Sequence, residues 1–233
     1  MTPAKRISVI IPLLNEAATL PATLASLTPS AQLEIIGVDG GSQDDTVALA
    51  RRLGIQVLET KPGRYHQLNQ GAAAATGEIL LFLHADTRLP ADFETVVQQT
   101  LALPQVVGGA FRLKIDAELP GIRLVEWGVY WRSRLLQLPY GDQAFFLYKS
   151  QFEQLGGFAA MPIMEDYDFV RRLGRYGKVV MPAAVVTTSG RRWQRLGVWQ
   201  TMLLNQLIVL AYACGVSPRR LANWYRCGVT PKK

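Results

Sequence analysis

The chain has 233 residues, which is enough for one α/β domain with a small appendage and tight for two separate domains. Its composition, 49% hydrophobic and 18% charged, is too apolar for a disordered protein and too often interrupted by charge for a polytopic membrane protein. The net charge of +7 suits an anionic partner, and because no basic stripe with interleaved aromatic residues is present, we expect phosphate-bearing ligands or acidic lipids and no nucleic acid.

The first half of the chain alternates short apolar runs with segments rich in helix formers. Residues 7–11 form a mostly β-branched run, typical of a strand buried on both faces, and Pro12 ends it. The elements predicted next are a helix at 17–27, a strand at 33–38, a helix at 44–53, a strand at 55–58, a helix at 65–75 and a strand at 78–83. This alternation predicts a mostly parallel sheet covered by helices, whose ligands bind beyond the carboxyl ends of the strands. Asp39 and Asp86 follow two of these strands.

The rhythm changes in the second half. After a helix predicted at 91–103, residues 106–115 alternate more, which indicates a single edge or mixed-direction strand. The elements predicted after it are a helix at 122–138, a strand at 144–148, a turn at 156–158, a helix at 165–175 and short extended segments at 179–188. We find no internal repeat and no boundary before Arg191, so we expect a catalytic domain at 1–190 and, at 191–233, a basic and apolar helical extension that packs on the domain or lies peripheral to a membrane.

Acidic residues stand at strand ends and at one helix start. They are Asp39, Asp86 and the cluster Glu165-Asp166 with Asp168. Taken singly, each is also explained as a helix cap or a surface carboxylate. Together, at the carboxyl edge of one sheet, they predict a site that holds a hard divalent cation and supplies a base.

Four motifs occur in an order that resembles a known family. They are the segments 9–16 (VIIPLLNE), 38–46 (VDGGSQDDT), 69–78 (from NQG to GE) and 83–86 (LHAD). In these segments the chain resembles the donor-binding half of family-2 glycosyltransferases with the GT-A fold. Within that family it is most similar to the short bacterial group described as radical-SAM/selenodomain-associated or arsenosugar-biosynthesis glycosyltransferases, from Ile7 to about Tyr225.

The resemblance implies a nucleotide-sugar site. Its residues would be Pro12, Asn15, Glu16, Asp39, Gly41, Ser42, Arg64, Asn69, His84 and Ala85. A carboxylate at Asp39 can accept a hydrogen bond from the imide N–H of a base, which in this family commonly goes with uridine. The guanidinium of Arg64 can fork two phosphate oxygens, although a surface position explains it equally well.

The resemblance also implies a divalent metal, Mn2+ or Mg2+. The family usually carries a DxD motif, and His84 stands here at its first position. Asp86 then remains the main metal ligand and would bridge the ion to the diphosphate. Since imidazole tolerates manganese better than magnesium, this departure bears on the identity of the metal, unless His84 only supports the site from behind.

The pair Glu165-Asp166 matches the family's ED pair at a helix start. The resemblance assigns Asp166 as the catalytic base and Glu165 as its neighbour or an acceptor contact. Such a base takes the proton of the acceptor hydroxyl while its oxygen attacks the anomeric carbon opposite the leaving diphosphate, which inverts the configuration. The alternative is that both carboxylates only complement the helix dipole.

Acceptor contacts are expected from two further segments. Asp142 and Gln143 precede a predicted strand, although a turn-forming Asp explains the first of them nearly as well. Arg191-Arg192-Trp193 is similar to the RW element of processive relatives, and Trp193 would stack on a sugar or pack in the core. The glutamine that usually precedes that element is absent at its spacing, so we expect no processive synthesis.

The segment 196–218 contains no charged residue and is about long enough to span the hydrocarbon core of a bilayer. Its Gln and Asn residues would be costly in lipid, and Arg and Lys flank both ends. This favours a helix that lies on an anionic membrane surface, or packs on the domain or on the twin subunit of a homodimer, over a spanning helix. The N-terminal apolar run is too short for a signal-peptide core, and Cys214 and Cys227 fit no disulfide or zinc pattern.

The sequence therefore predicts an inverting, metal-assisted glycosyltransferase in the cytoplasm or at the inner face of the membrane. Its partners would be a nucleotide-sugar donor, with UDP favoured, and a hydroxyl-bearing small-molecule or lipid-linked acceptor. A nucleotidyltransferase is one alternative, but the loop after the first strand lacks the glycine-rich basic pattern it needs. A dehydrogenase would need GxGxxG at that turn. A non-catalytic nucleotide-sugar-binding module recruited to a membrane is the other alternative.

Overall fold

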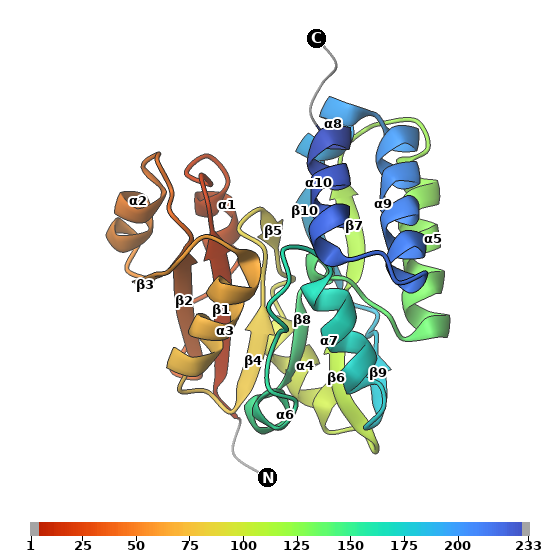
Figure 1. The fold of residues 1–233 in the computed structure, drawn as a ribbon. Helices are drawn as coiled ribbons and strands as arrows, with labels where there is room; N and C mark the ends of the chain where they lie inside the picture. The colour runs from red at the N-terminus through yellow and green to blue at the C-terminus, as the bar shows by residue number, and fades with distance from the viewer. Residues whose placement is uncertain (1–4, 230–233) are drawn as a thin grey trace.

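The computed structural model describes residues 5–229, which form two sheets with helices packed on their faces (Figure 1). The larger sheet has the strand order β3 (Gln56–Glu59), β2 (Leu33–Asp39), β1 (Ile7–Leu13), β4 (Ile79–Phe82), β8 (Phe145–Tyr148), β6 (Val106–Ala110) and β9 (Lys178–Val180). The smaller sheet has the order β5 (Thr87–Arg88), β10 (Val185–Ser189) and β7 (Arg112–Asp116).

Ten α-helices and one 3-10 turn connect and cover these strands within the described residues. They are α1 (Leu20–Leu24), α2 (Thr46–Arg52), α3 (Arg64–Ala74), α4 (Phe93–Leu101), α5 (Ile122–Leu136), η1 (Gly141–Gln143), α6 (Lys149–Gln154), α7 (Glu165–Leu173), α8 (Arg191–Leu196), α9 (Val198–Ala213) and α10 (Pro218–Val229). The N-terminal half lies on one side of the molecule, and α5, α9 and α10 lie on the other (Figure 1).

The mostly parallel sheet predicted for the first half is confirmed. β1 pairs in parallel with both β2 and β4, and β2 pairs in parallel with β3. Leu13 stands opposite Asp39 in this register, so the two strands end together at the carboxyl edge of the sheet. β8 departs from the pattern because it runs antiparallel to β4 and β6.

The single strand predicted at 106–115 is wrong, because the segment divides between the two sheets. β6 belongs to the larger sheet and β7 to the smaller one, and Phe111 lies between them. The backbone N–H of Phe111 donates to the carbonyl oxygen of Gln143 at 2.8 Å, and its ring is fully buried. This hydrogen bond joins residues that are far apart in the chain, and it lies where the chain leaves the larger sheet for the smaller one. The apolar pattern on either side of Phe111 does not indicate this break.

The helix predicted at 17–27 is also shorter than expected. α1 begins only at Leu20, because the preceding loop is bonded to another loop and cannot join the helix. Asn15 adopts a left-handed conformation with φ 55°, and its side chain accepts a hydrogen bond from the N–H of Gln43 at 2.8 Å. The short elements β5 and α6 were not predicted, since each is too brief to show a period in the sequence.

Two apolar clusters fill the two faces of the larger sheet. Side chains that alternate along β1 divide between them, with Ile11 in one cluster and Ile10 in the other. α3 lies close against Ile10, because Gly71 has no side chain to hold it away. This contact sets the position of α3, whose first residue is Arg64.

A third apolar cluster joins the C-terminal helices to the catalytic half. Met164 and Tyr167, at the start of α7, pack with Ile208 of α9 and Leu221 of α10. The segment 196–218 holds all of α9 and the turn to α10. None of the helices within residues 5–229 has both the length and the apolar character needed to cross a bilayer. The basic residues Lys232 and Lys233 lie outside the described residues.

Candidate active site

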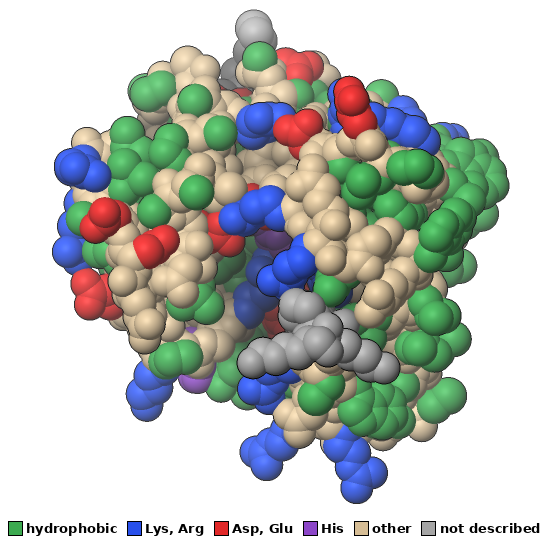
Figure 2. All heavy atoms as spheres, turned by 90° about the horizontal axis from the view of Figure 1, so that it is seen from above, with side chains coloured by type: hydrophobic (Ala, Val, Ile, Leu, Met, Phe, Trp, Pro, Cys, Tyr) green, Lys and Arg blue, Asp and Glu red, His purple; other side chains and the backbone are tan. Residues whose placement is uncertain are grey.

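A cleft of about 620 Å³ lies between the carboxyl edge of the larger sheet and the C-terminal helices. Its lining comes from the end of β4, from η1, from the start of α7, from β10 and from α8 to α10. The charged and titratable side chains in that lining are Arg64, His84, Asp86, Tyr140, Asp142, Glu165, Asp166, Tyr167, Arg192, Tyr225 and Arg226. Figure 2 shows acidic, basic and histidine side chains in a hollow at the middle of the upper face.

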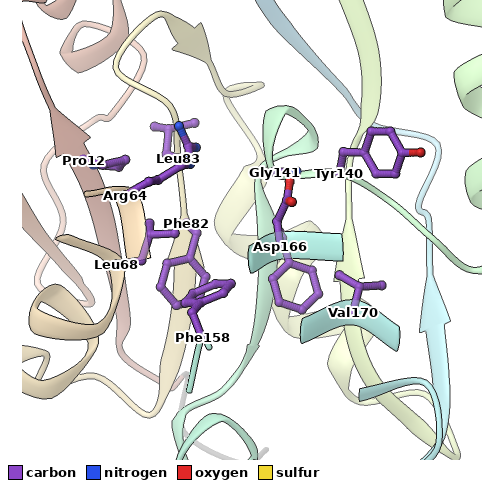
Figure 3. A pocket seen from close by; sticks show the side chains of 11 residues that line it. Pro12, Arg64, Leu68, Phe82, Leu83, Tyr140, Gly141, Phe158, Asp166 and Val170 are labelled. Carbon is purple, nitrogen blue, oxygen red and sulfur yellow. Dashed lines mark hydrogen bonds between the residues drawn. The ribbon is translucent and has the colours of Figure 1, made fainter. Parts of the chain in front are cut away.

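A much smaller pocket, of about 20 Å³, opens beside the cleft. Arg64, Pro12 and Leu83 lie on one side of it, and Asp166, Tyr140 and Val170 lie on the other (Figure 3). Arg64 and Asp166 line both the small pocket and the large cleft. The guanidinium of one and the carboxylate of the other therefore meet the same space from opposite sides.

Asp166 sits in the first turn of α7. One of its oxygens accepts the backbone N–H of Gly141 at 2.7 Å, and the other accepts the N–H of Tyr167 at 2.7 Å. These bonds orient the carboxylate, and since each oxygen has two lone pairs, each keeps one for another donor. Asp166 is thus a carboxylate held by the backbone, with capacity to accept a proton.

Glu165 is buried next to Asp166 and pairs with Arg64. Its Oε1 lies 3.3 Å from Nε of Arg64, and its side chain is only 5% exposed. Burial and the neighbouring charge of Asp166 raise the pKa of Glu165 to about 7, and Arg64 opposes this rise. Glu165 is thus close to the point of half protonation at neutral pH.

His84 contacts Arg64 from the other direction, through its Nε2. Burial first, and then the charge of Arg64, lower the pKa of His84 well below its usual value. The imidazole is therefore neutral, and its Nε2 can accept a hydrogen bond from the guanidinium. Arg64 therefore contacts both His84, shortly after β4, and Glu165, at the start of α7.

Asp86 lines the cleft and is linked by an arginine to Glu16, in the loop after β1. Nη2 of Arg191, in α8, lies 3.2 Å from Oδ2 of Asp86 and 2.8 Å from Oε2 of Glu16. The guanidinium is half exposed, so this link is open to water. A side chain from the C-terminal extension thereby contacts Glu16, expected in the nucleotide-sugar site, and Asp86, the expected metal ligand.

Asp39 organises the loop that follows β2. Its carboxylate accepts the backbone N–H groups of Gly41, at 2.8 Å, and Ser42, at 3.0 Å. The hydroxyl of Ser42 in turn accepts the N–H of Asn15 at 3.0 Å, which ties the loop after β1 to the loop after β2. These loops hold most of the residues expected to contact the nucleotide.

Three predicted site residues are engaged inside the protein. Both ends of the Asn69 amide bond the backbone of Phe158, each at 2.9 Å. Gln143 is fully buried and donates to the carbonyl oxygen of Phe111 at 3.0 Å. The carbonyl of Ala85 accepts the hydroxyl of Thr23 at 2.8 Å. None of the three lines the cleft or the small pocket, so their contact with a ligand stays a prediction.

The far wall of the cleft contains polar atoms that have no partner. Among the described residues, the buried side-chain atoms without a hydrogen bond are Nε of Arg132, Oδ1 of Asp142 and Nε of Arg192. Asp142 and Arg192 both line the cleft. Burial lowers the pKa of Arg192, and the nearby charge of Asp142 opposes that change. A hydrogen-bond acceptor, Oδ1 of Asp142, and a hydrogen-bond donor, Nε of Arg192, therefore lie on the same wall without partners.

Comparison with known proteins identifies the family. A family model described as Glycosyl transferase family 2 matches residues 8–162, which is more than half of the chain. The chain belongs to this family. As the four motifs predicted, this is a family of glycosyltransferases, and the matched residues run from β1 to the loop before α7. The likeness to the radical-SAM or arsenosugar group stays a prediction.

A mycobacterial relative and two solved structures resemble this glycosyltransferase. A PGL/p-HBAD biosynthesis glycosyltransferase of Mycobacterium bovis is 42% identical over 95 residues, 37% of each chain. The mannosyltransferase PcManGT from Pyrobaculum calidifontis, in complex with GDP-Man and Mn2+, has a TM-score of 0.67 at 21% identity, over 98% of this chain and 70% of that one. Staphylococcus aureus TarS with UDP-GlcNAc has a TM-score of 0.62 at 17% identity, over 79% and 58%. The matches to these structures confirm the GT-A-like α/β fold, and the match to the relative spans little more than a third of that relative.

The side chains that could bind a metal in the cleft are few, so they suit an ion whose other ligands come from a bound substrate. Within the described part of the chain, no group of three or more His, Cys, Asp or Glu side chains could hold an ion unaided. Asp86 and the neutral His84 both line the cleft and provide one carboxylate and one imidazole. Such a pair fits an ion whose remaining ligands are phosphate oxygens and water.

Sequence reasoning missed the part that α8 plays in the site. Arg191 and Arg192 were noted only as members of a motif and as charges flanking an apolar segment. The structure brings Arg191 to Asp86 and Arg192 to the wall opposite Asp142. The signal that was present is the doubled arginine directly before an aromatic residue, at the end of the last strand.

Proposed function

We propose that this glycosyltransferase moves a sugar from a nucleotide-diphosphate donor to a hydroxyl group of its acceptor, with inversion at the anomeric carbon. One observation supports this above the others: Arg64, Asp86 and Asp166 line a single cleft. A cation, a metal-binding carboxylate and a base are the groups that transfer from a diphosphate leaving group requires.

The donor would lie over the carboxyl ends of β1, β2 and β4. Pro12, Asn15 and Glu16 from one loop and Asp39 to Ser42 from the next would surround its nucleotide. UDP is favoured because the Asp39 carboxylate can accept the imide N–H of uracil. Neighbours of the same fold are described with UDP-GlcNAc and with GDP-Man, so both nucleotides belong in any test.

The chemistry would be a single displacement. The acceptor oxygen forms a bond to the anomeric carbon while the bond from that carbon to the diphosphate oxygen breaks, and the hydroxyl proton passes to Asp166. Arg64 offers positive charge to the departing diphosphate across the small pocket. Asp86 and His84, with phosphate oxygens of the donor, would hold Mn2+ or Mg2+, which supplies further positive charge to the leaving group.

The acceptor would bind against the far wall. Oδ1 of Asp142 and Nε of Arg192 are unpaired, so one can accept a bond from a hydroxyl group and the other can donate to it. Ile163, Met164 and Ile208 line the same space. This combination fits a hydroxyl carried on a partly apolar body, either a small molecule or a lipid-linked one.

A donor screen tests the proposal. The protein is titrated with UDP-, GDP- and TDP-sugars with and without Mn2+, by calorimetry, and then incubated with each to detect slow hydrolysis. We expect one nucleotide sugar to bind more tightly with Mn2+ and to release its nucleotide. Metal-independent affinity for all of them, with no hydrolysis, would remove the catalytic proposal and leave a binding module.

A further inference from the structure

Large apolar side chains are exposed on one side of the molecule. Of the fifteen exposed large hydrophobic side chains in the described residues, nine belong to α5 and α9. They are Leu124, Trp127, Trp131, Leu135 and Leu136 of α5, and Trp199, Leu203, Leu207 and Leu210 of α9. We name this set the α5–α9 face. Figure 2 shows hydrophobic side chains gathered along the right edge, the side on which α5 and α9 lie in Figure 1.

The spacing of these residues makes each set a continuous stripe. In α5 they recur every three or four residues from Leu124 to Leu135, and in α9 they do so from Trp199 to Leu210. The two helices lie side by side, since Gly121 at the start of α5 faces the ring of Trp199 at the start of α9. The two stripes together are too broad to be scattered surface residues.

α9 carries no charged residue from Val198 to Ala213, and its inner face already packs through Thr201 and Ile208. Its outer face is mixed, because Gln200 and Gln206 are exposed beside the leucines. Large leucines on an uncharged helix normally have a covering surface. The outer face of α9, with Leu203 60% exposed and Leu210 61% exposed, is therefore a surface that lacks its cover in the isolated chain.

Basic residues stand at both ends of the α5–α9 face. Arg123 and Arg195 lie at the end where α5 and α9 begin, and Arg134, Arg219 and Arg220 lie at the end where they finish. All five are exposed. The acidic residue of α5, Glu126, is mostly buried and pairs with Arg123 at 2.7 Å. After Asp168 the sequence contains twelve Lys and Arg and no Asp or Glu.

We propose that the α5–α9 face binds the surface of a membrane that contains anionic lipids, with α5 and α9 lying in the plane of the interface. The leucines would enter the boundary between head groups and acyl chains, and the tryptophans would anchor at the head-group level. The arginines at both ends would contact lipid phosphates, which is the charge complementarity that an anionic bilayer offers. This inference does not rest on the transferase chemistry.

A second copy of the chain is the other cover that an apolar face can have. Pairing two copies through this face would bring their five exposed arginines toward one another, and the exposed acid beside them in each copy is Glu118, next to Arg123 at the start of α5. An anionic bilayer presents the opposite charge, so it satisfies both the apolar stripes and their basic ends.

Vesicle flotation of the whole protein tests the proposal. The protein is mixed with vesicles of phosphatidylcholine alone or of phosphatidylcholine with phosphatidylglycerol, at low and high salt. We expect flotation with the mixed vesicles that weakens with salt. The variants L203Q/L207Q and W127Q/L135Q should each reduce the bound fraction about tenfold or more. The control L53Q/L103Q, at exposed leucines elsewhere, should bind as the parent does.

Circular dichroism and titration with a nucleotide sugar check that each variant is folded. Equal binding to both kinds of vesicle, no binding to either, or the same loss in L53Q/L103Q as in the other variants would overturn the proposal. So would light scattering that shows a dimer which L203Q/L207Q converts to a monomer, because a second copy would then be the cover.

Discussion

Arg64 and Glu165, which both line the cleft, form an ion pair with 3.3 Å between Nε and Oε1, and the acid in this pair is almost completely buried. The pair joins two helices that are far apart in the chain: α3, between β3 and β4, and α7, between β8 and β9. Burial and the charge of Asp166 hold the pKa of Glu165 at about 7 in spite of the guanidinium. The carboxyl group is therefore charged only at a cost in free energy.

This raised pKa predicts the pH dependence of stability. In the unfolded chain Glu165 titrates near its usual value of 4.5, so the folded protein binds more protons between that value and about 7. The contribution of this group to stability is thus greatest at low pH and falls as the pH rises through 7. The variant E165Q should gain about 1–3 kcal/mol of unfolding free energy relative to the parent between pH 5 and pH 8.

Urea denaturation at the two pH values measures this difference. The variant E153Q provides the control, because Glu153 is largely exposed and should leave the pH dependence unchanged. If the unfolding free energies of E165Q and the parent run parallel from pH 5 to pH 8, the pKa of Glu165 is not raised.

Asp166 as the base predicts a variant that binds the donor and does not transfer. D166N keeps the shape of the side chain but cannot take a proton, so turnover should fall about 100- to 10,000-fold while the dissociation constant of the donor stays within a small factor. D168N is the matched control, since Asp168 lies in the same turn of α7 and pairs with Arg172 at 2.8 Å. Normal turnover in D166N would exclude Asp166 as the base.

Asp86 as the main metal ligand predicts a loss that depends on the metal. D86A should weaken donor binding about tenfold or more when Mn2+ is present and little when it is absent. Calorimetric titration of both proteins under both conditions measures this, and D116A, at an exposed acid in β7, serves as the control. An unchanged response to Mn2+ in D86A would remove the residue from the metal site.

The position of Arg191 predicts that α8 contributes to binding of the nucleotide-sugar donor. Its guanidinium reaches both Glu16 and Asp86, so it stands where a diphosphate would lie and can bind the phosphate oxygens. R191A should weaken donor binding about tenfold, whereas R195A, one turn further along α8, should not. Unchanged or tighter binding in R191A would exclude Arg191 as a donor contact.

Gly71 predicts a change in stability through the packing of α3. A Cβ at this position would collide with Ile10 and come within 3.1 Å of Cγ2 of Val38, so G71A should lower the unfolding free energy by about 1–3 kcal/mol. Gly128 in α5 has open space around it, and G128A should raise the same quantity by about 0.5–1 kcal/mol. Thermal unfolding of both proteins checks the two signs, and equal shifts would contradict the packing.

The part of the fold that could be predicted is the part with local signals. β1, β2 and β4 are mostly apolar runs, and their order with the helices between them follows from that pattern. The break at Phe111 could not be predicted, because it depends on a bond to Gln143, which is far along the chain. Where a strand leaves one sheet for another is decided by such distant bonds.

The candidate site divides in the same way. Acids at strand ends could be predicted, since parallel strands bring their carboxyl ends to one edge. The bonds between Asn69 and Phe158 could not be predicted, because an amide that bonds the backbone looks the same in sequence as one that bonds a ligand. The reach of Arg191 to Glu16 spans 175 positions of the chain, and no local pattern carries that information.

The far wall of the cleft comes from elements that follow the last strand. The family match ends at residue 162, while α8, α9 and α10 supply Arg192, Ile208 and Tyr225 to the lining. Replacement of the last forty or so residues would therefore rebuild that wall and leave the strands under the nucleotide untouched. Related proteins could therefore change their acceptor through substitutions in α8 to α10 and keep the same nucleotide-sugar donor.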